Sequence, residues 1–474
     1  MSDRSPSERH AARPDCPGAR TVRAEAIDAA MLDQDALRVI SRLRRSGHEA
    51  YLVGGCVRDL MVGRAPKDFD VATDAHPRAI KRLFKNGRII GRRFRLVHIH
   101  YGQHIVETAT FRADPFSRET PEEERESDAD GAGAPAEREE PDDLLITEDN
   151  EFGTAEQDAR RRDFTVNALF LDPLQHVIHD YVGGLTDLEA GLLRTIGDPL
   201  VRLAEDPVRI LRAVKFATRL GFRIDEPTWE AMCALAPSLS RSAPPRVLEE
   251  ILRLLRSGTA LGAMRMLRAC GALRVILPQV DAYLGSKEAA ADQERADTFW
   301  RLMEALDADV HAGFVPSTPV CLALLTLRLI EREADPRTRT LRGPPPDLAI
   351  VAEEVLDPLA ISARLSRRDA GRAKRLILHQ KRFTQPTGKR FRPQIFLRSE
   401  EFPEALDLFR IRMAARGQGW DIYEGWRARH EAALKADPAE PVDGAGAGEA
   451  GGDRPPRRRR RRRRRGGAGG APVA

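Results

Sequence analysis

The stretch LVGGCVRDLMVGRAPKDFDVAT, residues 52–73, decides the fold of the first part of this chain. It opens at the end of a buried strand, EAYLVGG, continues through a short helical segment, CVRDLMVG, and closes in a second strand, DFDVAT. Because side chains alternate between the faces of a strand, Asp68 and Asp70 are expected on one face while Phe69 and Val71 face the core. Two converging carboxylates suit Mg²⁺, although a DxD motif alone is more often a pair of solvated aspartates.

A glycine pair precedes these aspartates at the junction of the strand and the helix. Gly54 and Gly55 allow backbone N–H groups to approach a phosphate at the positive end of a helix, and Arg58 adds charge one turn later. A glycine pair alone is usually a tight connection. The ordered combination of phosphate cradle, arginine and carboxylates within residues 52–73 favours a site that binds a triphosphate and metal ions.

The segments around this motif predict an α/β domain. Residues 1 to about 30 are polar and are expected to be disordered, and MLDQDALRVISRLRRSG reads as an amphipathic helix closed by Gly47. HPRAIKRLF is typical of a helix. RIIGRRFRLVHIHYGQHIVETATFR indicates a hairpin of two strands that turns near residues 101–103.

The second half of the chain is expected to be helical between two charged segments of low complexity. Residues 117–143 carry twelve acids and three arginines, a net charge of −9, and predict a disordered insert. Amphipathic segments follow from about residue 155 to about Ala436. Residues 437–474 surround nine consecutive arginines, Arg457 to Arg465, and predict a mobile basic tail.

Composition excludes several classes of protein. The five cysteines never approach CxxC spacing, which argues against a zinc site or a disulfide framework and favours a reducing, cytoplasmic setting. The N-terminus has no apolar signal region, and no stretch is long and apolar enough to span a membrane. His98, His100 and His104 lack a further ligand at useful spacing, so we interpret them as ordinary sheet residues.

The segment EDPVRILRAVKF can be interpreted as a helix with its capping residues or as a segment that binds a nucleotide. Asp206 can cap a helix that starts at Pro207 and ends at Gly221. Arg209 lies within one turn of Glu205 and Asp206, and basic residues continue along the same helix at three-residue spacing. Contact with a nucleotide would explain this basic stripe.

Together with RRDFTVNALF, these motifs resemble those of the class II nucleotidyltransferases of the polymerase β superfamily, the group of bacterial poly(A) polymerases and CCA-adding tRNA nucleotidyltransferases. The resemblance runs from about residue 49 to 255 and implies two Mg²⁺ ions held by Asp68 and Asp70, with ATP as substrate. It also implies a third catalytic carboxylate, for which we favour Asp163 and keep Glu107 as the alternative. The nucleotide-binding residues implied are Gly54, Gly55, Arg58, Arg162, Glu205, Asp206, Arg209 and Arg212. Lys215 stands where the family usually has arginine, and it lacks the planar fork of that side chain.

The fold implied is α+β, a polymerase β-like palm with a mixed sheet and helices, followed by an all-α neck and body. The expected divisions are a disordered segment at 1–30, the palm at 31–173, the neck for base recognition at 174–255, an RNA-binding body at 256–436 and the tail at 437–474.

Two segments resemble poly(A) polymerases more than CCA-adding enzymes: the basic strands LFKNGRIIGRRFRLVHIHYG and, more loosely, the later KRFTQPTGKRFRPQIFLRSEEFPEALDLFRIRM. The function expected is template-independent addition of AMP from ATP to RNA 3′ ends, by a monomer. The alternatives are a CCA-adding enzyme and a non-catalytic RNA-binding protein on the same fold. The acidic insert and the arginine run carry opposite charges, −9 and +9, and could mask each other; independent solvated segments are the other reading.

Overall fold

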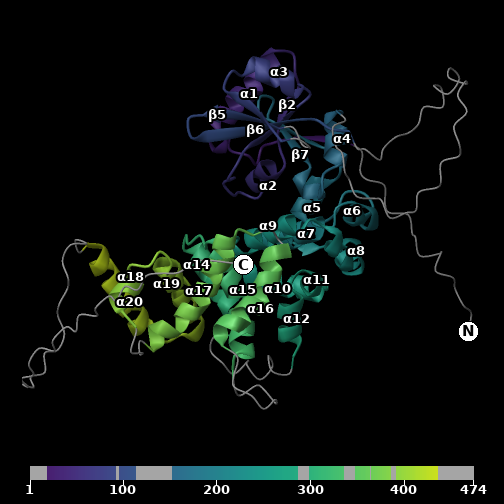
Figure 1. Cartoon of the computed structure of the whole chain (residues 1–474). Coiled ribbons are helices and arrows are strands. Elements are labelled where there is room, and N and C mark those ends of the chain that lie inside the picture. The colour runs from purple at the N-terminus through teal and green to yellow at the C-terminus, as the bar shows by residue number, and fades with distance from the viewer. Residues whose placement is uncertain are drawn as a thin grey trace, which may run out of the picture.

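The computed structural model describes residues 19–91, 96–113, 152–286, 298–335, 347–362, 365–385 and 391–435. These residues form an N-terminal head built on a β-sheet, followed by a helical neck and body (Figure 1). The expected α+β fold class is therefore confirmed. The acidic insert and the arginine run lie outside the described residues, so their predicted disorder and mutual masking stay predictions.

The head contains an eight-stranded sheet in the order β1-β8-β7-β2-β3-β6-β5-β4. Its strands are β1 (Arg20–Arg23), β2 (Ala50–Val53), β3 (Asp70–Thr73), β4 (Gly87–Ile90), β5 (Leu96–Tyr101), β6 (His104–Thr110), β7 (Leu169–Asp172) and β8 (Val177–Asp180). Strands β3 and β6 are parallel, and the other neighbouring pairs are antiparallel. The sheet is therefore mixed, as expected for the palm.

Both faces of the sheet are covered at its centre, and the predicted alternation of side chains decides which residue packs where. Leu52 and Val71 belong with Ile40 to the large core cluster, on the face that helix α1 covers. Tyr51 and Val53 face the other way, into a smaller cluster that includes aromatic residues of neighbouring strands. Strand β2 is consequently buried along its whole length, which fixes the position of the turn that follows it.

Short helices connect the strands of the head. They are α1 (Gln34–Arg45), α2 (Gly55–Met61), α3 (Pro77–Leu83), α4 (Ala155–Arg160), the 3-10 turn η4 (Thr165–Asn167) and α5 (Gly184–Glu189). The Asp33 side chain caps α1 by accepting a hydrogen bond from the Ala36 N–H at 2.7 Å. The chain leaves α1 through Gly47 in the left-handed conformation, as predicted for its end.

The neck and body are helical apart from a two-stranded pairing. The elements are β9 (Leu192–Leu193), α6 (Pro199–Glu205), α7 (Arg209–Leu220), β10 (Arg223–Ile224), α8 (Glu226–Leu235), η5 (Ala236–Arg241), α9 (Pro244–Leu255), α10 (Ala260–Ala269), α11 (Ala272–Ile276), α12 (Pro278–Gly285), α14 (Phe299–His311), α15 (Thr318–Glu333), α16 (Leu348–Ser362), α17 (Arg367–Thr384), α18 (Pro393–Leu397), α19 (Phe402–Arg416) and α20 (Trp420–Lys435). Helix α15 is buried continuously from Pro319 to Ile330 and forms the centre of the body. The last of these helices, α20, reaches Lys435, where the described residues also end, so the expected end of the helical region near Ala436 stays a prediction.

The sheet is wider than the sequence indicated. Strand β1 lies inside the segment 1–30 that was predicted to be disordered, so that prediction was wrong for Arg20–Arg23. The sequence did not indicate this strand because backbone pairing with β8 holds it, while three of its four side chains are exposed and Val22 is only partly buried. The sheet also continues to Asp180, past residue 173 where the palm was expected to end.

Other observed helix and strand boundaries differ from the predicted ones by a few residues. The hairpin turns at Gly102 as predicted, but the segment before it forms an additional strand, β4, paired with β5. The helical hydrogen-bond pattern of α7 starts at Arg209, after a turn at residues 207–208, and the Asp206 side chain accepts a hydrogen bond from the Val208 N–H, as expected of a capping residue. Gly221 ends α7 in the left-handed conformation, as predicted.

No helix among the described residues is both long enough and apolar enough to cross a membrane.

Candidate functional site

The pairing of β2 with β3 brings the glycine turn beside the aspartates. Val53, the last residue of β2, pairs with Asp70, the first residue of β3. Gly54 and Gly55 follow directly, so the turn lies at the edge of the sheet from which Asp70 projects. Asp68 lies two residues before β3, outside the strand that was predicted to contain it.

A cavity of about 600 Å³ opens at this edge, between the head and the neck. It is lined by Gly54, Gly55, Cys56, Arg58, Asp59, Lys67, Asp68, Asp70, Arg162, Asp163, Asn167, Asp206, Arg209, Arg212, Phe216, Arg219, Arg246 and Arg253. The lining holds eight basic side chains against five acidic ones, a balance that suits a polyanionic ligand. Of the predicted site residues, only Glu205 and the alternative third carboxylate, Glu107, are absent from this lining.

Gly54 is required at the turn for two reasons. Its φ of +75° is a conformation that L side chains rarely adopt, and a Cβ there would lie 3.1 Å from a guanidinium nitrogen of Arg162. Arg162 is held in this place by Asp158, which accepts its hydrogen bonds at 2.9 and 3.1 Å. The turn and the arginine therefore fit closely against each other at one side of the cavity.

The Asp70 carboxylate is destabilised by its surroundings. Burial raises the pKa of Asp70 to about 6, with further contributions from the negative charges of Glu107 and Asp68 that outweigh the opposing effect of Arg162. Such crowding of acids is unfavourable unless a cation is present. The local charge distribution therefore fits a cation at this edge of the sheet.

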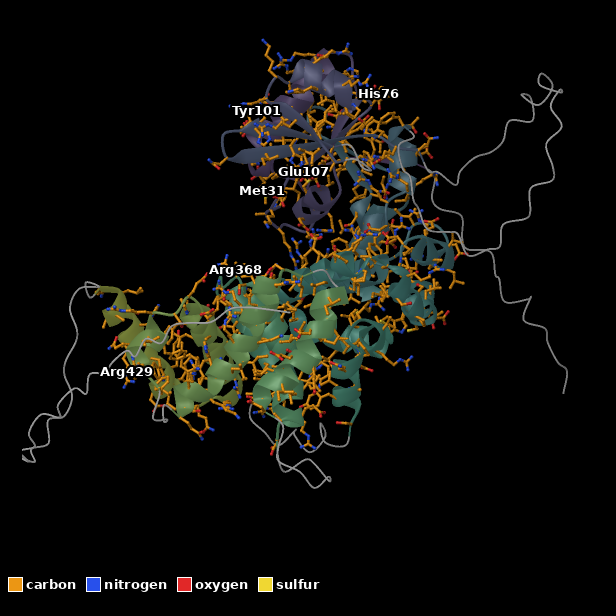
Figure 2. The ribbon with its side chains drawn as sticks, viewed as in Figure 1. Met31, His76, Tyr101, Glu107, Arg368 and Arg429 are labelled. Carbon is orange, nitrogen blue, oxygen red and sulfur yellow. The ribbon has the colours of Figure 1, made fainter. Side chains whose placement is uncertain are left out.

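The strand register explains why Glu107 reaches Asp70. Val71 of β3 pairs with Thr108 of β6 in the parallel ladder, so Glu107 neighbours Asp70 on the same face. The Glu107 side chain is half exposed and pairs with His98 of β5 at 3.5 Å. Figure 2 shows Glu107 in the lower part of the head, closer to the helical body than Tyr101.

A stability measurement tests the charge state of Asp70. We expect Asp70→Asn to raise the midpoint of thermal unfolding by several degrees at about pH 7.5 without divalent metal. The folded pKa of about 6 lies above the ordinary 3.8, so the carboxyl stabilises the fold fully below pH 3.8 and loses that contribution as pH rises through 6. The corresponding free energy is at most about 3 kcal/mol.

The control for this measurement is pH. Near pH 4 the wild type and Asp70→Asn should unfold at closer temperatures, because the Asp70 carboxyl is then largely protonated. Magnesium should raise the midpoint of the wild type more than that of the variant. A variant that melts below the wild type at about pH 7.5 contradicts the assignment.

Most cations that line the cavity are paired with a carboxylate. The pairs are Arg58 with Asp59, Arg162 with Asp158, Arg209 with Glu205, Arg212 with Asp163, Arg219 with Asp59, Arg246 with Asp206, and Arg253 with Glu249 and Glu250. These pairs fix the guanidinium groups before any ligand arrives, which lowers the entropy lost on binding.

Arg58 is the most enclosed of these cations. It is 2% exposed, donates from Nε at 2.9 Å and from an Nη atom at 2.7 Å to Asp59, donates to the side-chain oxygen of Asn167, and lies 5.2 Å from the Phe216 ring centroid. Asp59 in turn accepts a hydrogen bond from Arg219 of α7 at 3.0 Å. Arg58 and Asp59 therefore join the head to the neck directly behind the cavity.

Asp163 is engaged on several sides. Its carboxylate accepts hydrogen bonds from Arg212 Nε at 2.7 Å, from the Phe164 N–H at 2.9 Å and from the Asn167 amide at 3.2 Å. Burial alone would raise its pKa, but Arg212 and the hydrogen bonds from Arg212 and Asn167 hold the pKa of Asp163 below its ordinary value. Asp163 thus positions Arg212 at the cavity wall.

The predicted base-reading segment divides into a buried part and a part that faces the cavity. Glu205 is 3% exposed and accepts hydrogen bonds from Arg202 at 2.8 Å and from Arg209 at 2.9 Å. Asp206 lines the cavity and accepts two hydrogen bonds from Arg246 of α9, at 2.8 and 2.6 Å. Glu205 therefore orients Arg209, whereas Asp206 and Arg209 face the cavity.

Several lining residues were missed in the sequence. Lys67 and Phe216 lie inside quoted motif segments but were not singled out, and Arg219, Arg246 and Arg253 come from segments without a recognised motif. The seven-residue spacing of Arg246 and Arg253 along α9 puts them on one face, which was the available signal. Nothing in the sequence indicated that this face turns toward the head. Lys215, the departure from the family pattern, pairs with Glu250 at 2.7 Å.

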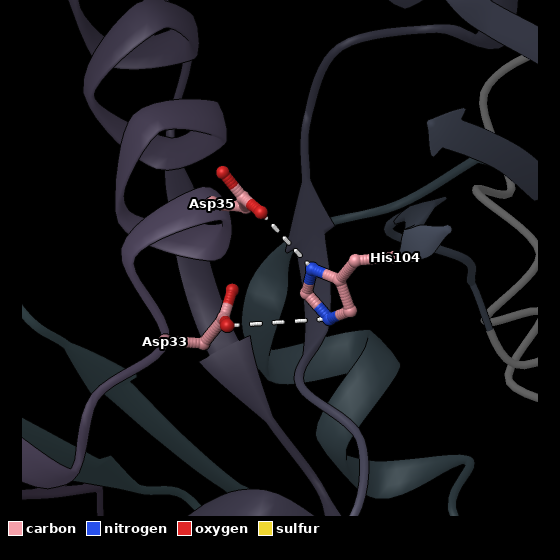
Figure 3. A group of neighbouring side chains, drawn as sticks. All are labelled: Asp33, Asp35 and His104. Carbon is pink, nitrogen blue, oxygen red and sulfur yellow. Dashed lines mark hydrogen bonds and ion pairs between the residues drawn. The ribbon is translucent and has the colours of Figure 1, made fainter. Parts of the chain in front are cut away.

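A separate cluster of possible metal ligands lies on α1 and β6 (Figure 3). Asp33, Asp35 and His104 have ligand atoms within 4.8 Å of one another, the only such group of three or more among the described residues. The two ring nitrogens of His104 face different carboxylates, at 3.1 Å from Asp35 and 4.0 Å from Asp33. This arrangement joins the start of α1 to β6 electrostatically. The carboxylate oxygens of Asp68, Asp70 and Glu107 do not all lie within 4.8 Å of one another.

The mixed sheet, the glycine turn and an aspartate pair at a cation-lined cavity define a nucleotidyltransferase head. Comparisons with known proteins agree. Family models match residues 50–194 as "Poly A polymerase head domain", residues 221–284 as "Probable RNA and SrmB-binding site of polymerase A" and residues 344–465 as "Polymerase A arginine-rich C-terminus". The chain belongs to the nucleotidyltransferase family that contains poly(A) polymerases and CCA-adding enzymes.

Individual relatives fall into two groups. The chain is 43% identical over 256 residues to poly(A) polymerase I of Haemophilus influenzae, covering 54% of each chain. It is 32% identical over 280 residues to the CCA-adding enzyme of Bacillus licheniformis, covering 59% of this chain and 63% of the relative. The chain thus spans about half the length of the poly(A) polymerases it matches.

Solved structures share the fold. A Bacillus stearothermophilus CCA-adding enzyme in complex with CTP aligns with a TM-score of 0.60 at 24% identity, over 85% of this chain and 83% of that one. A Thermotoga maritima CCA-adding enzyme complexed with tRNA aligns with a TM-score of 0.54 at 18% identity, over 90% and 88%. At these identities the likeness shows the fold alone.

Proposed function

We propose that this protein adds AMP from ATP to RNA 3′ ends without a template. The observation that carries the proposal is the cavity itself, where Asp68 and Asp70 face a wall of fixed cations beside a glycine turn. The identity of 42–43% to poly(A) polymerases, against 32–33% to CC- and CCA-adding enzymes, favours AMP addition over the runner-up. The match to an arginine-rich polymerase A C-terminus supports the same choice.

The residues present fit divalent cations. The raised pKa of Asp70 records a concentration of negative charge that a cation would relieve. Asp68 and Asp70 would hold the ions, with Glu107 as the neighbouring carboxylate. When bound, two Mg²⁺ ions would supply stabilisation of the attacking and leaving oxygens of phosphoryl transfer.

The protein groups around the carboxylates position the substrates. We assign the triphosphate to the N–H groups of the Gly54–Gly55 turn and to Arg162 and Arg212, which both line the cavity. Because their carboxylate partners already orient the two guanidinium groups, little reorganisation accompanies ATP binding. The 3′-hydroxyl of RNA would then attack the α-phosphate and release pyrophosphate.

The neck residues face the adenine base. Asp206 and Arg209 line the cavity, and the two hydrogen bonds from Arg246 hold the Asp206 carboxylate in one orientation. A fixed acceptor beside a fixed donor can recognise the edge of one base and reject another. The helical body would hold the RNA backbone with little sequence preference. We propose action as a cytoplasmic monomer in mRNA processing.

The direct test offers the purified protein an oligo(A) primer and a tRNA that lacks its 3′ end, with ATP or CTP, and sequences the products. Long A tails on both RNAs support the proposal. CCA on the tRNA alone supports the CCA-adding alternative, and no extension supports a non-catalytic RNA-binding protein.

Base selection should depend on the pair between Asp206 and Arg246. We expect Arg246→Ala to reduce the preference for ATP over CTP about tenfold, because the released Asp206 carboxylate loses its fixed orientation. The ratio of kcat/KM for the two nucleotides measures this effect. Arg223→Ala, at an exposed position outside the cavity lining, is the matched control and should leave the ratio unchanged. An unchanged ratio in Arg246→Ala would remove this pair from base recognition.

A further inference from the structure

The ribbon formed by β4, β5 and β6 has one buried face and one open face. On β5 the residues alternate regularly: Val97 and Ile99 are buried, while His98 and His100 remain partly exposed. The buried side packs into the large core cluster with α1 and α3. The two histidines therefore point away from that core.

Strand β6 continues the open face. Val106 is fully buried, whereas its neighbours Ile105 and Glu107 are exposed, Ile105 by 42%. Ile105 is directly opposite His100 in the ladder, and Glu107 is opposite His98. An isoleucine and two imidazoles thus lie together on the open side of the head.

This face leads directly to the candidate catalytic carboxylates. The ladders place Arg88, His98 and Glu107 in one row across β4, β5 and β6, and the parallel ladder with β3 extends the row to Asp70. Neighbouring strands are about 4.8 Å apart, so the row spans roughly 14 Å. A molecule with one end at Asp70 can therefore extend across the ribbon.

The open face has the chemistry of a surface for single-stranded nucleic acid. The rings of His98 and His100 lie with centroids 6.5 Å apart, Ile105 adds apolar area, and Arg88 at the outer strand is exposed. Aromatic rings stack on bases, and a cation at the far end suits a backbone phosphate. None of these four residues lines the cavity assigned to ATP.

We infer that the open face, defined as Arg88, His98, His100 and Ile105, binds the 3′-terminal nucleotides of the RNA primer. The bases stack against the two imidazoles and Ile105, a phosphate lies near Arg88, and the terminal 3′-hydroxyl points along the row toward Asp70. This inference rests on the proposed function, and it assigns the primer to the head as well as to the helical body.

The test compares His100→Ala with His100→Phe, because His98 is the histidine that pairs with Glu107, whereas His100 lies opposite Ile105 in the ladder. We expect the alanine variant to raise the KM for an oligo(A) primer about tenfold with the KM for ATP and kcat unchanged. Phenylalanine retains an aromatic ring and should restore most of the primer affinity. The matched control is His104→Ala, which removes a histidine facing Asp35 on the other face of the same ribbon.

Each outcome separates this inference from the proposed function. A wild type that extends no RNA contradicts the function, whatever the variants do. If the wild type is active, an unchanged primer KM in His100→Ala overturns the primer site, and so does an equal rise in His104→Ala. A rise in the KM for ATP instead of primer also overturns it. If the wild type adds CCA to tRNA, the same variants are measured with the shortened tRNA as primer.

Discussion

Replacing Asp70 with asparagine should lower kcat for AMP transfer on the order of 10³-fold or more, because electrostatic stabilisation at the reacting phosphate is usually the largest catalytic contribution. Asparagine keeps the size of the side chain and removes the charge that burial and Glu107 destabilise. The measurement is single-turnover extension of an oligo(A) primer at saturating ATP. Asp68→Asn should give a similar loss.

The matched control for this loss is Asp74→Asn. Asp74 follows the opposite end of β3, where it accepts hydrogen bonds from His48 and the Glu49 N–H, far along the strand from Asp70. It should keep wild-type activity. Because Asp70→Asn is expected to be more stable than the wild type without metal, unfolding cannot account for its loss. Extension by a double variant, Asp68→Ala with Asp70→Ala, would refute the metal assignment.

The sequence predicted the part of the site whose residues lie close together along the chain. The turn at Gly54 and the aspartate at Asp70 meet because β2 and β3 are adjacent antiparallel strands. The sequence predicted the strand, helix, strand order but not the antiparallel direction of the pair. Asp68 lies outside the observed strand β3, yet it lines the same cavity as Asp70. For these residues, neighbourhood in the sequence was sufficient to predict that they share one site.

Side-chain pairs between residues far apart in the chain could not be predicted from the sequence. Arg246 reaches Asp206 across 40 residues, and Arg219 reaches Asp59 across 160. Such contacts depend on how the neck packs against the head, which no local periodicity encodes. The same limit explains Glu205: its place in the motif suggested contact with the base, but the fold buries it between two arginines.

The choice between Glu107 and Asp163 as third carboxylate illustrates this limit. Both were candidates in the sequence. Glu107 neighbours Asp70 on the same sheet face and raises its pKa. Asp163 already accepts three kinds of hydrogen bond, including a close pair with Arg212. An acid committed to an arginine has less negative charge to offer a cation, so we propose Glu107 as the metal-side carboxylate and Asp163 as a positioning residue.

Two variants distinguish these roles by their effects on the Mg²⁺ requirement, on the KM for ATP and on thermal stability. Glu107→Gln should lower kcat by about 10² to 10³ and increase the Mg²⁺ concentration for half-maximal activity, with little change in the unfolding midpoint, because the side chain is half exposed. Asp163→Asn should lower the unfolding midpoint, since it leaves Arg212 without its partner, and should raise the KM for ATP at an unchanged Mg²⁺ requirement. Reversal of the two Mg²⁺ titrations would return the third carboxylate to Asp163.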